Sequence, residues 1–538
     1  MLSVVPKVNQ YISKGEKIFI FPKVIEIASN FSNKNTKVFK EWLEMFDYEV
    51  VDDGNFINFE RDESMDEFCY KINVTANEIT IFASTDIGQF YALTTLFQMI
   101  ISEKYQECTI VDCPKFQYRS FSLDVSRHFF SIDEVKKLIN QAAILKLNYF
   151  HFHVSDDRGY RLPSKKFPKL NDIGSKRKEK NGVWKKEHYS VEEIQELVKF
   201  ANDRNIEIIP EIDIPGHSLA IIAAYPNLSC SKEARDVSVD GGVEKQIICG
   251  GNKAVREFLK QLLDEVCQLF PGKYIHLGGD EAPKESWEKC QDCQEALAQK
   301  NLANFEALQA DLLGDLSDYL SKKGKEVICW NEAVASGELS NEVVVQYWDE
   351  LHPDPSMLKE LEKGRKLILS NIQAFYSDYG YGMVPLQATY EYAPQILLQK
   401  IPISQNILGL ETPMWTEWVD NSQKLEELMF PRLVAFSEVA WTCKKNYSDF
   451  LKRLSNYQKV LKKFSIHYSE LKKLSVQDPN FLDLVIQDAL RMRVIDLEKV
   501  SFEEAKLKLL GWCHHLQRGY FTEQQESELM KKLNHLYS

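Results

Sequence analysis

Eight strand-like segments alternate with helical segments between residues 114 and 445, and this alternation restricts the fold more than any other feature. Each strand-like segment is a short apolar run, and the segments between them carry apolar residues at helical spacing. Two helices are expected to open with capping boxes, at Ser131–Glu134 and Ser190–Glu193. The expected strands cover residues 119–125, 148–154, 206–214, 274–277, 326–330, 343–347, 366–369 and 407–411.

This alternation predicts an α/β fold, a closed (β/α)8 barrel of the TIM type over residues 114–445. An open doubly wound sheet is the alternative, but no G-x-G-x-x-G follows the first strand. We expect residues 1–113 to form a small N-terminal α/β domain that serves packing, with strands at 17–21 and 78–82 and a helix at 90–100. Residues 446–538 predict a C-terminal helical extension with apolar stripes, typical of core packing or an oligomer face.

Charge and composition exclude several classes of partner. The net charge of −13 disfavours nucleic acids and anionic membrane surfaces, and no apolar run is long enough to span a membrane. The first residues lack the pattern of a secretory signal, and the eleven cysteines are scattered, so we expect free thiols and a cytoplasmic location. Cys290 and Cys293 form a C-x-x-C, a weak zinc signal; a pair of thiols on a helix face is the preferred interpretation, with no metal or cofactor.

Acidic and aromatic residues follow most of the expected strands. Asp280 and Glu281 come after Gly278-Gly279, where parallel α/β folds place their chemistry. Neighbouring residues point in different directions, so one carboxyl group is expected to donate a proton while the other positions the substrate. Tryptophans stand beside carboxylates at three further strand ends. Carboxylates are costly to bury without partners, and aromatic walls with convergent polar groups suit a sugar. The sequence therefore favours a carbohydrate site.

The segment His276-Leu277-Gly278-Gly279-Asp280-Glu281 resembles the H-x-G-G-D-E signature of the family 20 glycoside hydrolases, the β-N-acetylhexosaminidases. Further matches follow in the family's order at residues 123–128, 151–157, 213–217 and 415–417. The resemblance covers about residues 114–443, and more weakly the N-terminal domain. It implies an exo-acting hydrolase that releases terminal β-linked N-acetylhexosamine with retention, the acetamido oxygen of the substrate acting as nucleophile.

The resemblance also implies a role for individual residues. Glu281 would be the general acid and then the general base, and Asp280 and Tyr376 would hold the acetamido group. His217 would lie near the acid, and Asp378 would support Asp280 or the aglycone side. The remaining substrate-binding residues would be Trp330, Trp348 and Trp415 around the acetamido group, and Arg119, Asp156 and Glu417 at the outer hydroxyls. Arg127 and His128 are left outside the catalytic set, as an equally plausible structural pair.

Two other functions are retained for comparison. His151 and His153 share one strand face, as the ligands of a metal-dependent hydrolase would, although few histidines follow at later strand ends. A carbohydrate-binding protein without activity is the other alternative, which the retained Asp280, Glu281 and Tyr376 disfavour. The expected partner is a glycan or small saccharide; a homo-oligomer through the C-terminal helices is one option for assembly. The tail beyond about residue 470 is expected to serve stability or assembly rather than chemistry.

Overall fold

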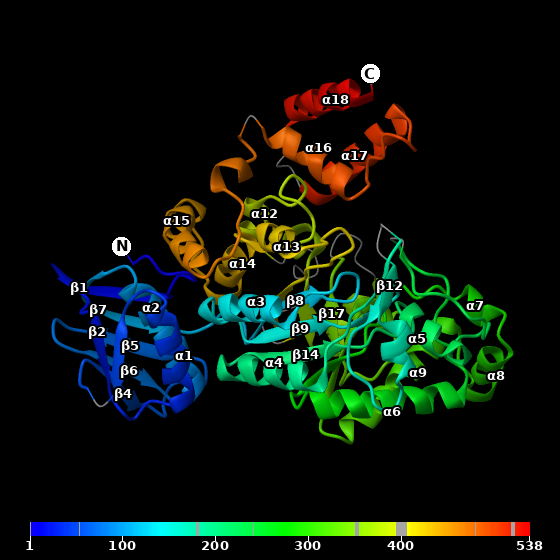
Figure 1. Cartoon of the computed structure of the whole chain (residues 1–538), viewed down its shortest axis with the longest axis horizontal. Helices are drawn as coiled ribbons and strands as arrows, with labels where there is room; N and C mark the ends of the chain where they lie inside the picture. The colour runs from blue at the N-terminus through cyan, green and yellow to red at the C-terminus, as the bar shows by residue number, and fades with distance from the viewer. Residues whose placement is uncertain are drawn as a thin grey trace.

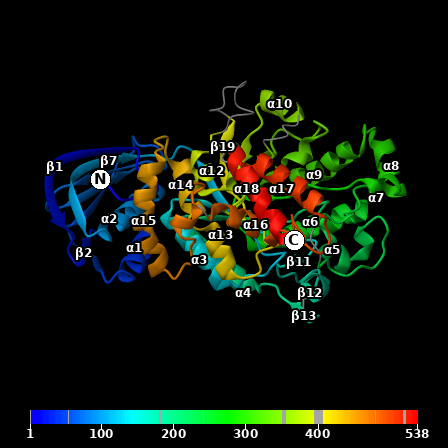
Figure 2. The same ribbon diagram turned by 90° about the horizontal axis from the view of Figure 1, so that it is seen from above.

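The computed structural model describes residues 2–52, 54–178, 182–239, 242–349, 355–393, 406–478, 480–517 and 522–537. A sheet with two helices lies at one end of the molecule, a barrel forms its centre, and a layer of C-terminal helices lies on one side of the barrel (Figures 1 and 2). Among the described residues, no helix combines the length and apolar character that a membrane crossing would need.

The barrel is closed by eight parallel strands, so the predicted fold class is confirmed. Their order around the barrel follows the chain. The strands are β8 (Tyr118–Asp124), β9 (Tyr149–His153), β14 (Glu207–Glu211), β15 (Tyr274–His276), β16 (Glu326–Trp330), β17 (Val344–Tyr347), β18 (Leu367–Leu369) and β19 (Ile407–Thr412). Each coincides with one of the expected runs, because buried parallel strands are nearly continuous apolar segments.

Helices surround the barrel and bury their apolar faces against it. Both predicted capping boxes are present, at Ser131 and Ser190, and they open the first two helices. The helices of the barrel are α3 (Ile132–Ile144), α4 (Val191–Asp203), α5 (Leu219–Ala224), α6 (Lys253–Leu269), α7 (Glu285–Glu288), α8 (Gln291–Lys300), α9 (Phe305–Ser321), α10 (Pro355–Glu362), α11 (Ile372–Phe375), α12 (Leu386–Glu391), α13 (Ser422–Met429) and α14 (Arg432–Trp441).

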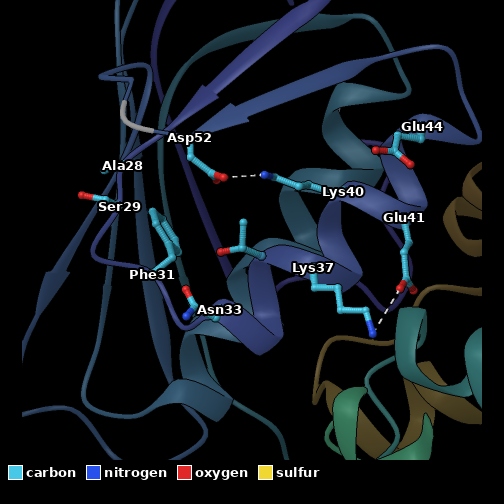
Figure 3. A pocket seen from close by; sticks show the side chains of 10 residues that line it. Ala28, Ser29, Phe31, Asn33, Lys37, Lys40, Glu41, Glu44 and Asp52 are labelled. Carbon is cyan, nitrogen blue, oxygen red and sulfur yellow. Dashed lines mark hydrogen bonds and ion pairs between the residues drawn. The ribbon is translucent and has the colours of Figure 1, made fainter.

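The N-terminal part is a mixed seven-stranded sheet in the order β1-β7-β5-β6-β4-β2-β3. Its strands are β1 (Gln10–Ile20), β2 (Val24–Ile27), β3 (Glu49–Asp52), β4 (Ile57–Arg61), β5 (Tyr70–Val74), β6 (Ile79–Ala83) and β7 (Lys104–Asp112). Helices α1 (Asn33–Glu44) and α2 (Asp86–Ile100) cover the face toward the barrel (Figure 1). An open pocket lies beside α1, where Lys40 pairs with Asp52 at 2.7 Å and Lys37 lies 3.9 Å from Glu41 (Figure 3).

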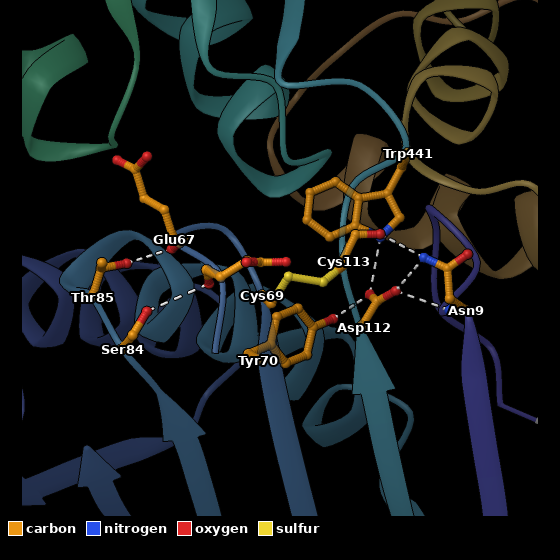
Figure 4. Close-up of a disulfide and its surroundings, with 10 residues drawn as sticks. Asn9, Glu67, Cys69, Tyr70, Ser84, Thr85, Asp112, Cys113 and Trp441 are labelled. Atoms are coloured by element: carbon orange, nitrogen blue, oxygen red, sulfur yellow. Dashed lines mark hydrogen bonds between the residues drawn. A yellow bond between two sulfur atoms is a disulfide. The ribbon is translucent and has the colours of Figure 1, made fainter. Parts of the chain in front are cut away.

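A buried carboxylate joins the N-terminal sheet to the barrel. Asp112, at the end of β7, accepts hydrogen bonds from Tyr70 of the sheet and from Trp441 of α14 at 2.9 Å (Figure 4). It also accepts one from Lys146, which follows α3, at 3.2 Å. Next to it, Cys69 and Cys113 form a disulfide. The expectation that all eleven cysteines are free thiols is therefore wrong: these two lie 44 residues apart in the chain, and strand pairing between β5 and β7 brings them together.

The C-terminal region is helical, as predicted. Helix α15 (Tyr447–Lys463) packs on the barrel and the N-terminal domain, where Arg453 donates to Glu438 and to the carbonyl oxygen of Val4. Helices α16 (Phe481–Arg491), α17 (Phe502–Gln517) and α18 (Glu523–Tyr537) share a small apolar core of their own that includes Met383 of the barrel. The tail is therefore anchored on a loop of the barrel.

Candidate active site

The carboxyl pair after β15 is held in an unusual backbone conformation. Gly278 and Gly279 have φ angles of 66° and 101°, in the region that favours glycine. A Cβ on Gly278 would lie 1.7 Å from Oδ1 of Asp213, and the same oxygen accepts a hydrogen bond from the Gly279 N–H at 3.0 Å. Glu281 itself has φ 41°. The two glycines thus let the chain pass close to Asp213 before it presents Asp280 and Glu281.

Glu281 and His217 form the reactive centre expected for proton transfer. Nε2 of His217 lies 3.3 Å from Oε2 of Glu281, whose side chain is 45% exposed. On the other side of the ring, Nδ1 lies 3.3 Å from Asp156 and 3.5 Å from Asp157. Burial opposes the charge on His217, but Asp156 raises its pKa well above the ordinary value. The hydrogen bond from His217 in turn lowers the pKa of Glu281. The structure thus places His217 beside Glu281, where the resemblance put it.

Asp280 is suited to holding a donor rather than to attacking carbon. Its side chain is 16% exposed, and its Oδ1 atom is buried without a hydrogen-bond partner among the described residues. Burial raises the pKa of Asp280, and burial together with the neighbouring Asp280 raises that of Asp213 well above its usual range. Two such close carboxyl groups are best accommodated when one keeps its proton. Asp280 therefore presents its Oδ1 atom, which has no hydrogen-bond partner among the described residues, to a ligand that can donate.

The three predicted tryptophans come together around Tyr376. The Trp330 and Trp415 ring centres are 5.9 Å apart, and the Tyr376 ring centre lies 6.3 Å from those of both Trp415 and Trp348. Trp330 is buried and donates its indole N–H to Glu211 at 2.8 Å; Trp348 donates to Glu332 at 3.0 Å. Hydrogen bonds from the indoles to buried carboxylates fix the ring planes, so the cluster is a preformed aromatic wall.

Asp156, Asp378 and Glu417 form the polar rim, with an arginine that the sequence analysis had left aside. Arg127 lies 2.8 Å from Asp156 and 3.6 Å from Glu417, and its guanidinium stacks 5.1 Å from the Trp415 ring centre. Burial, and then the charge of Glu417, raises the pKa of Asp378 to about 7, so the two carboxyl groups are neighbours. The placement of Asp378 beside Glu417 favours a role at sugar hydroxyl groups.

The structure contradicts one predicted site residue. Arg119 lies at the start of β8, at the opposite end of the barrel from the carboxyl pair. Its buried guanidinium donates to the carbonyl oxygens of Phe116, Gln117 and Lys146 and to the hydroxyl of Tyr91 in the N-terminal domain. The error has a physical reason: only residues at the carboxyl ends of barrel strands reach the catalytic face. Arg127, just past Asp124 at the end of β8, satisfies that condition.

Sequence reasoning also missed a buried layer beneath the site. Glu211, at the end of β14, lies 3.0 Å from His151, 3.1 Å from His276 and in direct contact with His153. The second nitrogens of His151 and His153 face Glu411 at 2.8 Å and Asp156 at 3.2 Å. Alternation along β9 was the available signal, since it aims both histidines into the barrel. Carboxylates already engage both rings, which disfavours the metal-hydrolase alternative.

The C-terminal tail reaches the loop that carries Tyr376 and Asp378. Arg491 donates to the carbonyl oxygen of Asp378 at 2.7 Å, and Asp488 accepts from the N–H of Gly382 at 2.7 Å. Tyr379 packs against Trp512 with ring centres 5.4 Å apart. That the tail matters for stability or assembly more than for chemistry stays a prediction, although α16 is in direct contact with a loop of the site.

A (β/α)8 barrel with an acid, an unpaired acceptor carboxylate and an aromatic wall at the carboxyl ends of its strands defines a carbohydrate-active hydrolase. Residues 116–444 match the model of the glycosyl hydrolase family 20 catalytic domain. The chain belongs to glycoside hydrolase family 20 and is a glycoside hydrolase, which confirms the resemblance stated from its motifs.

Relatives span much of the chain. A β-hexosaminidase of Vibrio furnissii is 30% identical, over 81% of this chain and 76% of its own length. One from Porphyromonas gingivalis is 32% identical over 72% of this chain, which spans only 52% of that relative. Among solved structures, the exo β-N-acetylglucosaminidase of Vibrio harveyi in complex with N-acetylglucosamine has a TM-score of 0.79 at 30% identity, covering 87% of this chain and 78% of that one. The β-hexosaminidase of Streptomyces plicatus with its product superposes with a TM-score of 0.76 at 26% identity, covering 87% and 96%.

Proposed function

We propose that the chain is an exo-acting β-N-acetylhexosaminidase that removes terminal β-linked N-acetylhexosamine with retention of configuration. The observation that carries this proposal is the buried, unpaired Oδ1 of Asp280 next to the aromatic wall of Trp330, Trp348 and Trp415. Among the described residues this oxygen has no donor, and a buried acceptor without a donor costs free energy, which a bound amide N–H would recover. An acetamido group provides that N–H together with a methyl group for the rings.

The proposed reaction needs no protein nucleophile. Glu281 gives its proton to the glycosidic oxygen while the acetamido oxygen of the substrate attacks C1, and the C1–O bond to the leaving group breaks. Asp280 accepts the acetamido N–H, which becomes more acidic as the oxazolinium ring forms, and Tyr376 donates to the acetamido oxygen. Glu281 then takes a proton from water, which attacks C1 and opens the ring. Both displacements invert C1, so the product retains the configuration.

The rim supports removal of the terminal sugar only. Arg127, Asp156, Asp378 and Glu417 lie near one another, with Arg127 beside Trp415, and offer donors and acceptors to the outer hydroxyl groups. A cluster of this kind would hold the non-reducing end of one sugar, so we propose that the binding site ends here. Release of internal fragments without monosaccharide would contradict the exo assignment. The cytoplasmic location and assembly through the C-terminal helices stay predictions; the Cys69–Cys113 disulfide weighs against the former, because disulfides persist in oxidising compartments.

A series of nitrophenyl glycosides tests the nucleophile. Fluorine on the acetyl methyl group withdraws electrons from the acetamido oxygen, so turnover should fall steeply from acetyl through difluoroacetyl to trifluoroacetyl. The β-glucoside, which lacks the amide, should hardly react. Comparing the rates on β-GlcNAc and β-GalNAc shows how strongly turnover depends on the orientation of the 4-hydroxyl group. A flat series, or a glycosyl ester trapped on a protein carboxylate, would overturn the proposal. Loss of activity with a chelator that does not unfold the protein would favour the metal hydrolase.

A further inference from the structure

Four cysteines gather in one cluster outside the catalytic residues. Cys230 follows a short 3-10 turn at Pro226–Leu228, Cys249 lies next to the isolated bridge between Ser229 and Ile248, and Cys290 and Cys293 lie at the start of α8. Their sulfur atoms all lie within 4.8 Å of one another. Cys249 and Cys293 are buried and the other two half-buried, and all four are free thiols. Three separate segments of the chain thus deliver their thiols to one point.

The spacing of the sulfur atoms fits a metal ion better than disulfides. The Sγ atoms of Cys249 and Cys293 are 3.6 Å apart, those of Cys249 and Cys290 3.8 Å, and those of Cys230 and Cys293 3.9 Å. Sulfur atoms about 2.3 Å from a central zinc, at the corners of a tetrahedron, are about 3.8 Å from each other. A disulfide would need about 2.05 Å. Cys249 and Cys293 each take part in two of these three contacts, and all four sulfur atoms lie within 4.8 Å of one another, as a shared centre requires.

The backbone around the cluster is shaped for close approach. A Cβ on Gly251 would lie 2.2 Å from the carbonyl oxygen of Asp292, so only glycine lets this segment lie against the first turn of α8. The backbone N–H groups of Gly251 and Asn252 also lie against the sulfur of Cys249. The segment that follows Cys249 thus packs closely on both the sulfur cluster and α8.

We propose that Cys230, Cys249, Cys290 and Cys293 bind one structural zinc ion. Four thiolates complete a tetrahedral shell and leave no open position for water, so the site is structural rather than catalytic. Soft thiolate ligands in this geometry select zinc or iron over hard cations such as magnesium and calcium. The interpretation of Cys290 and Cys293 as a mere pair of thiols on a helix face is replaced, because two further cysteines complete the set.

The proposed ion would tie together two loops that carry the proton-transfer pair. The segment before Cys249 is hydrogen-bonded to the loop after β14, where the N–H of Ile248 donates to Pro215, two residues before His217. Cys290 and Cys293 follow Glu281 on the chain after β15, and Trp287 of α7 donates to the carbonyl oxygen of Ile248 at 2.8 Å. The zinc site would act as a positioning element for these loops, at the end of the barrel away from the N-terminal domain (Figure 1).

The test is the metal content of the full chain, purified without chelators and measured by elemental mass spectrometry and by native mass. We expect one zinc per chain, released when a mercurial reagent blocks the thiols and detected with a zinc-binding dye. Zinc loss should raise the protease sensitivity of the segments 229–239 and 242–250 and lower the Tm. Less than about a tenth of a zinc per chain after growth in zinc-supplemented medium, one iron in its place, or disulfides among these four cysteines would each overturn the proposal.

A pair of variants separates ligation from general thiol chemistry. Cys230→Ser should lose zinc occupancy at least about tenfold, since a hydroxyl group replaces a thiolate ligand. Cys267→Ser is the matched control: Cys267 is half-buried on α6 and does not belong to the cluster. It should keep the zinc content of the unsubstituted chain. Zinc retained in Cys230→Ser, or lost equally from both variants, would contradict the assignment. If Cys230→Ser does not fold, the stoichiometry and thiol-release measurements on the unsubstituted chain still decide.

Discussion

At the scale of single residues, proton transfer is proposed to take place at the pair of His217 and Glu281. Their 3.3 Å contact lowers the pKa of Glu281, so the free site favours the carboxylate, whereas the first proposed step needs the acid. A leaving group that departs poorly depends on that proton, and an activated one does not. Glu281 is therefore the residue whose removal should discriminate between substrates.

Glu281→Gln should reduce kcat on a disaccharide about 10²–10⁴-fold and on a dinitrophenyl glycoside much less, because general acid catalysis is needed mainly for the poor leaving group. Steady-state kinetics on both substrates measure this. The substitution keeps the size of the side chain, and the matched control is Glu285→Gln, on the short helix α7 that follows. Equal losses on the two substrates would assign the acid to another residue.

Glu332 makes stability depend on pH. Burial, and then the nearby charge of Asp280, raises its pKa from 4.5 to about 8. Between these values the folded chain binds more protons at this site than the unfolded chain, so the free energy of unfolding should fall as the pH rises through that range. In Glu332→Gln this fall should be smaller by roughly 3–4 kcal/mol between about pH 5 and 8, at about 1.4 kcal/mol for each pH unit between the two pKa values. Urea unfolding of both proteins at the two pH values measures this difference. An equal fall in the free energy of unfolding for the two proteins would refute the prediction.

At the scale of elements, α16 supports the loop that carries Tyr376 and Asp378. Its Arg491 holds the carbonyl oxygen of Asp378, and its Asp488 fills the space beside Gly380 and accepts from Gly382. The loop is therefore braced from outside the barrel, by a helix whose Arg491 is 113 residues from Asp378 in the chain. Small displacements of positioning groups reduce rates strongly.

Arg491→Gln should lower kcat/KM about 10-fold with only a small change in the free energy of unfolding, because the loop loses its brace while the cores stay intact. The control is Lys499→Gln: Lys499 is an exposed residue of the same tail, paired with Asp496 at 3.5 Å. Kinetics and thermal unfolding of both variants are compared. Unchanged activity in Arg491→Gln would support the expectation that the tail serves stability or assembly more than chemistry.

At the scale of the whole molecule, the N-terminal domain is joined to the barrel by buried polar groups. Asp112 receives donors from both parts, and Arg119 donates from the barrel to Tyr91 of the domain at 2.7 Å. Arg119 also lies over the Tyr91 and Trp441 rings, 5.3 and 5.1 Å from their centres. These contacts form only when the N-terminal domain is packed on the barrel. They are consistent with the packing role that the sequence predicted for this domain.

Arg119→Met should lower the stability of the chain, whereas Arg127→Met should lower its activity. Arg119→Met leaves buried carbonyl oxygens unpaired and should lower the free energy of unfolding by roughly 2–3 kcal/mol, with kcat/KM of the folded protein unchanged. Arg127→Met should lower kcat/KM about 10- to 100-fold, since hydrogen bonds to charged groups contribute about 1.5–3 kcal/mol each. Denaturant unfolding and kinetics, run side by side, separate them. A kinetic defect in the folded Arg119→Met protein would return Arg119 to the site.

The sequence by itself determined the eight strands, the two capping boxes and the position of Asp280 and Glu281, because apolar periodicity and turn residues act over a few neighbouring positions. Only the tertiary structure decided which of two arginines near one strand, Arg119 or Arg127, reaches the site. It also decided that α16 braces the loop after β18 and that Cys230 and Cys249 join Cys290 and Cys293. These outcomes rest on contacts between residues far apart in the chain, which closure of the barrel creates and no local pattern records.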